Sequence, residues 1–333
     1  MKFFLSLLLI FVLCTTNFFG CSQIFVEGEN TPPLNDSSDT NISDKPQTDT
    51  PPTNTPSEEP NQNKNFIHLS FDDVTACFSN LAISKYTNLF DEPFFAKLKT
   101  VHDTYGAKFS LYTYNSVLEK VPTDYSQDFS NNSSWLKIGF HSNASGLSLA
   151  NATYDDGKTY WNNFVSQVTR ICGTTNNLDR LPRLEFFAGS KNALLGMRDA
   201  NYGAFGFLSS DDNRLSYYFD NQTMKFLFDN DFWIDEELSL NFLATDVRAD
   251  WWFNFSTTNE YKAPIKNTVY EELVFRSTAQ SFENSFNKLI FFTHEWLVYN
   301  GNTVNDKFDT VVDACRFASD MQISFDYPQN LTF

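Results

Sequence analysis

The stretch "FIHLSFDDV" (66–74) decides the fold prediction. Its apolar residues are those of a buried β-strand, and the strand ends on two adjacent carboxylates, Asp72 and Asp73. Side chains alternate between the two faces of a strand, and like charges at neighbouring positions repel each other. The pair therefore points to a chemical role, although two turn-forming acids are the simpler interpretation.

Five more apolar runs have the same strand character and are bounded by turn residues. They are "AKFSLYTY" (107–114), "LKIGFHS" (136–142), "RLEFFAG" (183–189), "AFGFLSS" (204–210) and "KLIFFTHEW" (288–296). Helical patterns lie between them. The clearest is "DEPFFAKLKTVHDTYG" (91–106), with an acidic cap, Pro93 in its first turn and Gly106 at its end. Two apolar stripes at helical spacing predict further helices; they comprise Tyr160, Phe164, Val168 and Ile171, and Phe308, Val311, Val312 and Cys315.

The alternation of strands and helices over residues 66–333 predicts one α/β domain with a mainly parallel sheet, in the form of a barrel. Segment 216–244 fits this alternation less well. Its Asn-Gln and Asp-Asn turns predict an inserted β-hairpin.

Met1 is followed by one Lys and by an apolar run from Phe3 to Leu13, which at about 11 residues is too short to span a bilayer. We expect a signal peptide over residues 1–21 and a protein located outside the cytoplasm. "FFGCS" (18–22) is similar to a bacterial lipobox, with Phe18 where Leu is usual. Cleavage there would leave Cys21 to carry lipid and anchor the protein to a membrane of the cell envelope. Simple secretion is the alternative.

Residues 22–64 become rich in Pro, Thr, Asn and acidic side chains, as in "KPQTDTPPTNTPSEEPNQNK" (45–64). This tract has almost no apolar residues, so burial cannot repay the entropy lost on ordering. It is predicted to be a disordered stalk that carries the domain at residues 65–333.

The chain has 41 acidic and 24 basic side chains and a net charge of -17. Such a protein repels phosphate backbones, which argues against a nucleic-acid partner. Its 36 Phe, 14 Tyr and 6 Trp residues supply a large core and also faces for a sugar ring. Beyond the N-terminal segment the cysteines are Cys77, Cys172 and Cys315, whose spacing matches no metal knuckle. They are predicted to be mostly buried side chains.

Several predicted strands end on ionisable groups: the Asp72–Asp73 pair, His141 and His294. In a parallel α/β barrel the working residues lie at the C-terminal ends of the strands, so these groups are expected to meet at one rim. His68, early in its strand, and His102, on a helix surface, are predicted to be structural.

The order of "SFDD" (70–73), "GFHSNAS" (139–145), "RLEFFAGS" (183–190) and "FFTHEW" (291–296) resembles the polysaccharide deacetylases of the NodB-homology superfamily, carbohydrate esterase family 4. Each motif alone is short. Their order and their strand-end positions make the set more specific. The resemblance implies a distorted (β/α) barrel of the polysaccharide deacetylase type.

The resemblance also implies a metal-dependent hydrolase, acting as a monomer, that removes acetyl groups from an extracytoplasmic polysaccharide or cell-wall glycan. By position, Asp72 would be the general base, His294 the general acid and Arg183 the catalytic arginine, while Asp73 and His141 would hold a divalent metal, with zinc expected. A cation on one of two adjacent carboxylates offsets their repulsion, so that the two can serve unlike roles.

One position departs from the family pattern. Ser145 stands where the family usually has a second metal-binding His, and a hydroxyl is a poor neutral ligand for zinc. Glu185 is a candidate replacement, although an ion pair with Arg183 is the alternative for its carboxylate. Asp246 and the Asp211–Asp212 pair are further acids that could reach the rim.

Two other classes of function stay open from the sequence. A deacetylase-like domain without activity would only bind carbohydrate, which Ser145 and the many aromatic residues favour. A metal-free glycosidase could use Asp72 with Glu295, because such enzymes need two carboxyls about 5–9.5 Å apart. That mechanism leaves His141 and His294 without a role.

Overall fold

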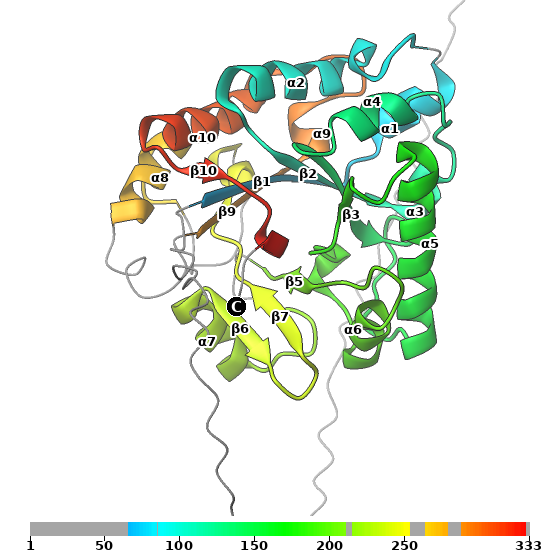
Figure 1. Ribbon diagram of the computed structural model, residues 1–333. Helices are drawn as coiled ribbons and strands as arrows, with labels where there is room; N and C mark the ends of the chain where they lie inside the picture. The colour runs from blue at the N-terminus through cyan, green and yellow to red at the C-terminus, as the bar shows by residue number, and fades with distance from the viewer. Residues whose placement is uncertain (1–65, 85, 211–214, 254–263, 279–287, 331–333) are drawn as a thin grey trace, which may run out of the picture. The chain divides into compact units, whose positions relative to one another are not determined.

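The apolar run that ends on the two acids forms strand β1 (Phe66–Asp72), and all seven of its residues are buried. It pairs in parallel with β2 (Phe109–Tyr114) on one side and with β9 (Lys288–His294) on the other (Figure 1). The computed structural model describes residues 66–84, 86–210, 215–253, 264–278 and 288–330, all within one compact unit, Glu58–Phe333.

The described strands pair in two sheets. The larger sheet has the order β4-β3-β2-β1-β9-β8, with β10 also paired to β1, and all its pairs are parallel. The smaller sheet has the order β5-β7-β6. The remaining strands are β3 (Leu136–Ser142), β4 (Leu178–Asp179), β5 (Gly206–Leu208), β6 (Phe232–Asp235), β7 (Leu240–Leu243), β8 (Val247–Arg248) and β10 (Ser324–Phe325). The predicted α/β class with a mainly parallel sheet is confirmed.

Backbone hydrogen bonds connect the two sheets. The amides of Phe205 and Leu208, in and beside β5, donate to the carbonyls of Arg180 and Pro182 just after β4, at 2.7 and 3.0 Å. On the other side, β7 is followed after three residues by β8, which pairs with β9. The strands therefore follow one another round a distorted barrel.

Alternation along β1 separates the inside of this barrel from its outside. Ile67, Leu69 and Phe71 belong to the large apolar core. His68, Ser70 and Asp72 have the opposite parity, and a small separate apolar cluster fills part of the space on that side; it contains Phe66, Tyr112, Leu181, Leu208, Leu243 and Ile290. The last inward positions of the parallel strands consequently lie together at one rim.

Helices connect the parallel strands. They are α1 (Ala76–Ile83), α2 (Pro93–Tyr105), α3 (Asn115–Leu118), α4 (Ser126–Asn131), α5 (Tyr154–Cys172), α6 (Lys191–Arg198), α7 (Asn221–Asn230), α8 (Val269–Thr278), α9 (Glu295–Val298) and α10 (Asp309–Asp320). Figure 1 shows α2 and α10 near each other along one side of the strands and α5 beside α6. The predicted stripes on α5 and before and within α10 lie against the core, where Phe164, Val168, Ile171, Phe308 and Cys315 are fully buried.

The predicted ends of α2 are confirmed. The Glu92 carboxylate accepts hydrogen bonds from the amides of Phe94 and Phe95 at 2.8 and 3.1 Å, and Pro93 is the first helical residue. Gly106 ends the helix with a left-handed φ of 72°.

Two local predictions need correction. Residues 183–189 do not form a strand, because Glu185–Phe187 is a 3₁₀ turn in which Phe186 and Phe187 have φ of 59° and 54°. Within 216–244 the predicted hairpin exists as the antiparallel pair β6 and β7. The Asn-Gln pair, however, begins helix α7, since the Asp220 side chain caps the amide of Thr223 at 2.7 Å.

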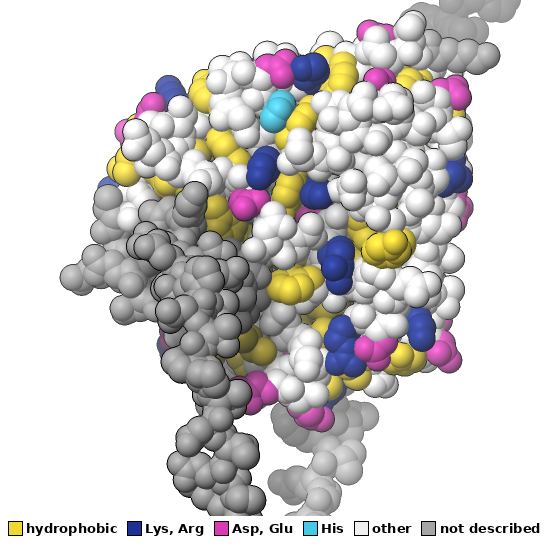
Figure 2. Space-filling view, in the orientation of Figure 1, with side chains coloured by type: hydrophobic (Ala, Val, Ile, Leu, Met, Phe, Trp, Pro, Cys, Tyr) yellow, Lys and Arg dark blue, Asp and Glu magenta, His cyan; other side chains and the backbone are white. Residues whose placement is uncertain are grey.

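The signal peptide, Cys21 and the stalk lie outside the described residues. No helix of the described part is long and apolar enough to cross a membrane. The three described cysteines are free and buried, as predicted. Figure 2 shows acidic and basic side chains interspersed over the face in view.

Candidate active site

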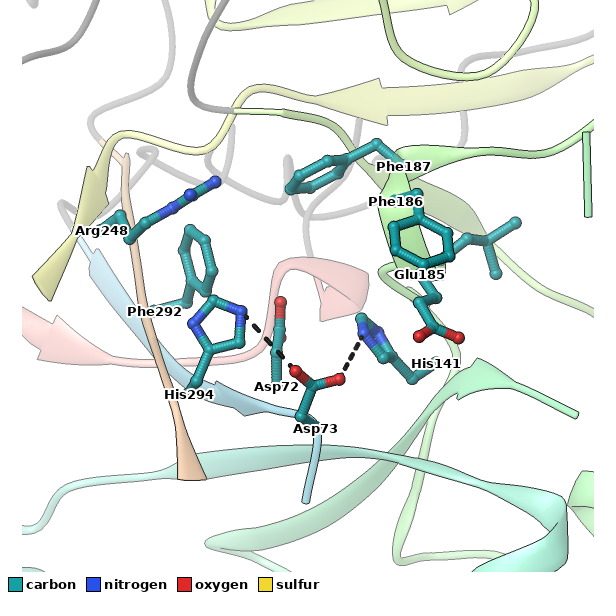
Figure 3. A pocket seen from close by; sticks show the side chains of 10 residues that line it. Asp72, Asp73, His141, Glu185, Phe186, Phe187, Arg248, Phe292 and His294 are labelled. Carbon is teal, nitrogen blue, oxygen red and sulfur yellow. Dashed lines mark ion pairs between the residues drawn. The ribbon is translucent and has the colours of Figure 1, made fainter. Parts of the chain in front are cut away.

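A pocket of about 130 Å³ opens at the C-terminal ends of the parallel strands (Figure 3). Its lining residues come from segments that are far apart in the sequence. They are Asp72, Asp73, His141, Leu184, Glu185, Phe186, Phe187, Arg248, Phe292 and His294. The structure thus brings the predicted acids and histidines to one place.

Asp72 is the last inward residue of β1 and is paired directly with His294 in the β1–β9 register. Its Oδ1 accepts a hydrogen bond from Nη1 of Arg183 at 2.9 Å, and both side chains are almost fully buried. Among the described residues no protein group donates to Oδ2. The Arg183 guanidinium therefore holds Oδ1 of Asp72, while Oδ2 faces the pocket as a possible proton acceptor.

Arg183 is fixed by more than this ion pair. Nη1 also donates to the Ser70 hydroxyl at 2.9 Å, and the guanidinium lies 5.2 and 4.3 Å from the ring centres of Tyr112 and Phe292. The ring faces attract the positive charge in the buried interior. Arg183 accordingly pairs with Asp72 and not with Glu185, which corrects the alternative given for Glu185.

Asp73 turns its side chain into the same pocket because its backbone leaves the strand conformation, with φ of 56°. Its Oδ1 lies 3.4 Å from Nε2 of His141, and its Oδ2 lies 3.9 Å from Nε2 of His294 (Figure 3). The Tyr114 hydroxyl donates to Oδ1, and the indole N–H of Trp296 donates to Oδ2 at 3.1 Å. Two protein donors and two imidazoles thus surround this carboxylate.

These contacts determine the charge of Asp73. Burial alone would raise the pKa of Asp73, but the hydrogen bond and charge of His141, the Tyr114 hydroxyl and the charge of His294 together hold that pKa well below its usual range. Asp73 is therefore an anion at any pH at which the protein is expected to work.

His141 ends β3 with its ring in a fixed orientation. Nδ1 donates to the Arg183 carbonyl at 2.6 Å, which leaves Nε2 facing Asp73. Burial alone would lower the pKa of His141, but Asp73, Asp72 and the Arg183 carbonyl raise it above its ordinary value. A backbone carbonyl on one ring nitrogen is also the support that metal-binding histidines commonly have.

His294 is paired with a second buried acid. Its Nδ1 donates to Oδ2 of Asp250, whose Oδ1 accepts from the Thr293 hydroxyl at 2.8 Å. Burial acts to lower the pKa of His294, but the hydrogen bond and charge of Asp250 raise it, with smaller contributions from Asp72 and Asp73. Trp296 covers the ring at a centroid distance of 5.1 Å. This arrangement suits a group that donates a proton from Nε2.

Glu185 lies on the pocket wall near His141 (Figure 3). Its two carboxylate oxygens accept from the amide of Gly146 at 2.8 and 3.0 Å. Burial raises the pKa of Glu185, and the charge of Asp73 acts in the same direction, whereas the Gly146 amide, His141 and the Tyr114 hydroxyl oppose the rise.

The donor set partly fits a divalent cation. A carboxylate oxygen and an oriented imidazole nitrogen face each other at Asp73 and His141, and these are ligand types that zinc accepts. Among the described residues, however, no three His, Cys, Asp or Glu side chains converge closely enough to hold a metal ion. The role of Glu185 as a ligand stays a prediction.

Other residues singled out from the sequence lie elsewhere. The Glu295 carboxylate accepts from the amides of Thr75, Ala76 and Cys77 at 2.7, 2.7 and 2.9 Å, so it caps α1 and does not line the pocket. Asp246 is buried and pairs with Lys288 at 3.3 Å, away from the rim. Asp211 and Asp212 are outside the described residues.

His68 and His102 have no place in the pocket lining. His68 is buried in the barrel, and neither of its ring nitrogens has a hydrogen-bond partner among the described residues. The His102 ring stacks on Trp135 at 4.4 Å, and its Nδ1 donates to the Ala107 carbonyl at 2.8 Å.

The residues at the site that were missed from the sequence include Asp250, Tyr114 and Trp296, and also Arg248, which lines the pocket. Asp250 follows the two-residue strand β8, which is too short to be recognised from its pattern. Tyr114 looks like any aromatic strand residue. Trp296 immediately follows the motif that contains His294, and its exposed position could have been suspected from that neighbourhood alone.

No protein-family model matches the sequence, and no curated protein matches it. Solved structures do match. The chain resembles polysaccharide deacetylases and a related esterase.

Three of these structures illustrate the likeness. A putative polysaccharide deacetylase from Mycobacterium smegmatis is 12% identical, with a TM-score of 0.45, over 79% of this chain and 86% of that one. A peptidoglycan N-acetylglucosamine deacetylase is 14% identical, with a TM-score of 0.40, over 79% and 86%. A family 4 acetyl xylan esterase from Clostridium thermocellum, solved with a cobalt ion, is 12% identical, with a TM-score of 0.40, over 78% and 87%. Likeness at these values shows no function, so the function of this protein is inferred from the residues of its site.

The buried pair of Asp72 and Arg183 gives a stability prediction. Arg183→Met should lower the free energy of unfolding by roughly 3–5 kcal/mol, because it leaves the Asp72 carboxylate buried without its partner. Adding Asp72→Asn should restore part of the loss. Urea unfolding measures both changes.

Arg316→Met is the matched control, because Arg316 pairs with Asp313 at 3.0 Å on the surface and its side chain is 53% exposed. That variant should lose less than about 1 kcal/mol. Equal losses for the two arginines would contradict the special role given to Arg183.

Proposed function

We propose that this protein is a hydrolase that removes acetyl groups from a polysaccharide. The observation that carries the proposal is that three groups meet around one pocket. They are the Asp72 carboxylate bound by Arg183, the His294 imidazole bound by Asp250, and the neighbouring pair of Asp73 and His141. Hydrolysis of an acetyl amide or ester needs a base for water, an acid for the leaving group and a positive group near the developing oxyanion.

Asp72 is the proposed general base. Arg183 binds one of its oxygens and fixes the direction of the other, which is open to the pocket. A carboxylate held in this way can take the proton from a water molecule as that water attacks the acetyl carbon. Arg183 acts through Asp72 as a positioning residue.

His294 is the proposed general acid. Asp250 binds Nδ1, so the proton that His294 delivers comes from Nε2. This nitrogen lies 3.9 Å from Oδ2 of Asp73. Since Asp250 raises the pKa of His294, the imidazolium form persists to higher pH than for an ordinary histidine. Protonation of the departing sugar nitrogen or oxygen then completes the hydrolysis.

Asp73 and His141 are the residues that would hold a divalent cation, with zinc as the expected ion. Bound there, the cation supplies Lewis acidity toward the acetyl carbonyl and toward the attacking water. His141 offers Nε2 as its donor because Nδ1 is occupied by the Arg183 carbonyl.

The surroundings of the pocket favour a sugar polymer of neutral or positive charge. Phe186 on the pocket wall is 54% exposed, and Trp296 beside His294 is 47% exposed. Exposed aromatic faces suit the apolar face of a pyranose ring. The net charge of -17 would repel a strongly anionic glycan.

We place the protein outside the cytoplasm, anchored through lipid on Cys21. The apolar N-terminal run, the lipobox-like "FFGCS" and the Pro-rich tract after it support this location. A glycan of the cell envelope would then be within reach of the domain at residues 65–333.

The chemistry is tested by acetate release from acetylated glycans with zinc supplied. Asp72→Asn and His294→Ala should keep bound zinc but lose roughly 10²–10⁴-fold in rate, as expected for a positioned base or acid. Asp73→Ala and His141→Ala should lose zinc and activity together. Metal analysis of each purified variant separates the two groups.

Unchanged acetate release in all four variants would show that the assigned site is wrong. A parent protein that binds glycan yet releases no acetate from any acetylated glycan would instead establish a carbohydrate-binding module without activity.

The pairing of His294 with Asp250 predicts a pH effect. The rate should fall as the pH rises through the raised pKa of His294, because only the protonated ring can donate. Asp250→Asn removes the charge that raises this pKa, so the alkaline limb of kcat/KM should move to lower pH. Asp103→Asn, on the exposed face of α2, is the control and should leave the profile in place. An unmoved alkaline limb in Asp250→Asn would refute the assignment.

The proposed anchor is tested with the full-length chain. Cys21→Ala should move the protein from the membrane fraction to the soluble fraction, or block its processing, because no thiol remains to carry lipid. Detergent partitioning measures the change. Identical partitioning of parent and variant would mean that Cys21 carries no anchor.

A further inference from the structure

A second arginine borders the candidate site and has none of the roles assigned above. Arg248 is the last residue of β8 and lines the pocket, with 8% of its surface exposed. It is paired with Phe292 in the β8–β9 register, and its guanidinium carbon lies 5.0 Å from the centre of the Phe292 ring. Figure 3 shows the Arg248 side chain extending toward the side of the pocket that carries Phe187. A permanent positive charge thus borders the space in which the proposed base and acid meet.

Two guanidinium groups lie over the Phe292 ring, and they differ in what they can reach. That of Arg183 lies 4.3 Å from the ring centre, is fully buried and donates to Asp72 and Ser70. Arg183 is not among the residues that line the pocket, whereas Arg248 is. Of the two, Arg248 is therefore the arginine that a molecule bound in the pocket can contact.

Three neighbouring strands carry the groups around this space. Asp72 on β1 and His294 on β9 are direct partners in the parallel register. Arg248 on β8 is paired two residues earlier along β9, with Phe292, whose side chain points to the same face of the strand as His294. An acyl group that lies against the Phe292 ring is consequently surrounded by the proposed base, the proposed acid and the Arg248 guanidinium.

The size of the pocket fits an acyl group. Its volume is about 130 Å³, whereas an apolar cavity of about 150 Å³ holds a single benzene molecule. An acetyl group and an attacking water molecule fit this space, and a sugar ring stays at its mouth. Leu184, Phe187 and Phe292 provide an apolar wall for the acetyl methyl group. The polar end of the acetyl group is then left to the charged residues of the lining.

We propose that Arg248 is a catalytic residue that stabilises the oxyanion formed from the acetyl carbonyl. The inference rests on the proposed function and adds a positive group supplied by the protein itself. The water oxygen bonds to the carbonyl carbon while a water proton passes to Asp72, and the carbonyl π electrons become a lone pair on the oxygen that faces Arg248. When these electrons return to the carbon, its bond to the sugar nitrogen or oxygen breaks, and that atom takes a proton from His294.

The charge of the oxygen changes during this reaction, which makes the contribution of Arg248 larger in the transition state than for bound substrate. A guanidinium is charged at every pH of interest and presents its donors in a rigid planar fork. Its hydrogen bond to an anionic oxygen is about twice as strong as one between neutral groups. An interaction that strengthens in the transition state raises kcat. Loss of Arg248 should therefore lower kcat.

Two other roles for Arg248 predict different kinetics. A guanidinium that binds an anionic substituent of the sugar acts equally on the bound substrate and on the transition state, so its removal raises KM and leaves kcat unchanged. A guanidinium that only packs on Phe292 supports the fold, and a guanidinium ion supplied in solution does not replace it.

The test measures acetate release, with zinc supplied, from an oligomer of an N-acetylated amino sugar and from an O-acetylated oligosaccharide. Arg248→Met should lower kcat and kcat/KM by the same factor, roughly 10²–10³-fold, as expected for one oxyanion donor. Its zinc content should equal that of the parent, because Arg248 is not one of the proposed ligands. Arg316→Met, at a surface arginine that is 53% exposed, is the matched control and should keep the parental rate.

Two further variants separate a contact with the oxyanion from support of the fold. Arg248→Lys keeps the charge without the planar fork and should retain more of the parental kcat than Arg248→Met. Methylguanidinium added to Arg248→Ala should restore part of the lost kcat and have no effect on the parent. Thermal unfolding checks that each variant is folded, and Arg248→Gln replaces Arg248→Met if the methionine variant does not fold.

Three outcomes overturn the inference. An unchanged kcat in Arg248→Met removes the arginine from the reaction. A rise in KM alone makes it a recognition residue for an anionic substituent. A loss of kcat that neither Arg248→Lys nor methylguanidinium reduces makes Arg248 a structural residue.

Acetate release by the parent distinguishes failure of this inference from failure of the proposed function. If the parent releases acetate and Arg248→Met does so at the same rate, only the role of Arg248 is wrong. If the parent releases no acetate from any acetylated glycan, with zinc supplied, the proposed function is wrong, and the role of Arg248 is wrong with it.

Discussion

The buried ion pair between Asp72 and Arg183 is the interaction on which the rest of the site depends. Removing two charges from water is costly, and the pair is tolerated because the geometry is close and the guanidinium is also held by Ser70 and by the faces of Tyr112 and Phe292. The backbone carbonyl of the same Arg183 accepts a hydrogen bond from Nδ1 of His141. Arg183 alone thus orients the proposed base, Asp72, through its side chain and a proposed cation ligand, His141, through its backbone carbonyl.

The site divides its two adjacent acids by environment. Asp72 remains in strand geometry, faces inward and meets a permanent cation. Asp73 leaves strand geometry through a positive φ and meets two imidazoles, a phenol and an indole. Identical side chains one residue apart therefore have unlike partners, which is the condition for unlike roles in catalysis. The question posed by two acids at a strand end has a local, geometric answer.

Much of this could be predicted from the sequence because parallel strands place their C-terminal ends at one rim. Side chains alternate with a period of two along β1, and two further predicted strands end at His141 and His294. These two observations were sufficient to predict that the acids and histidines meet at one rim. What failed was local. Residues 183–189 have the composition of a strand, but the pocket wall requires a tight turn there, with two consecutive Phe residues at positive φ. Asp250 and Tyr114 depend on a two-residue strand and on a bulge, and neither leaves a pattern in the sequence.

The neutral histidine inside the barrel sets an acid limit for the fold. Burial, and then the charge of Arg183, lower the pKa of His68 from 6.5 to about 3. Below pH 6.5 the unfolded chain takes up a proton that the folded chain refuses, so acid favours unfolding progressively down to about pH 3. The whole difference corresponds to roughly 4–5 kcal/mol. His141 and His294, with raised pKa values, give their full stabilisation already below pH 6.5 and cannot compensate further acidification. A protein built in this way is suited to neutral surroundings, because acidification lowers the free energy of unfolding.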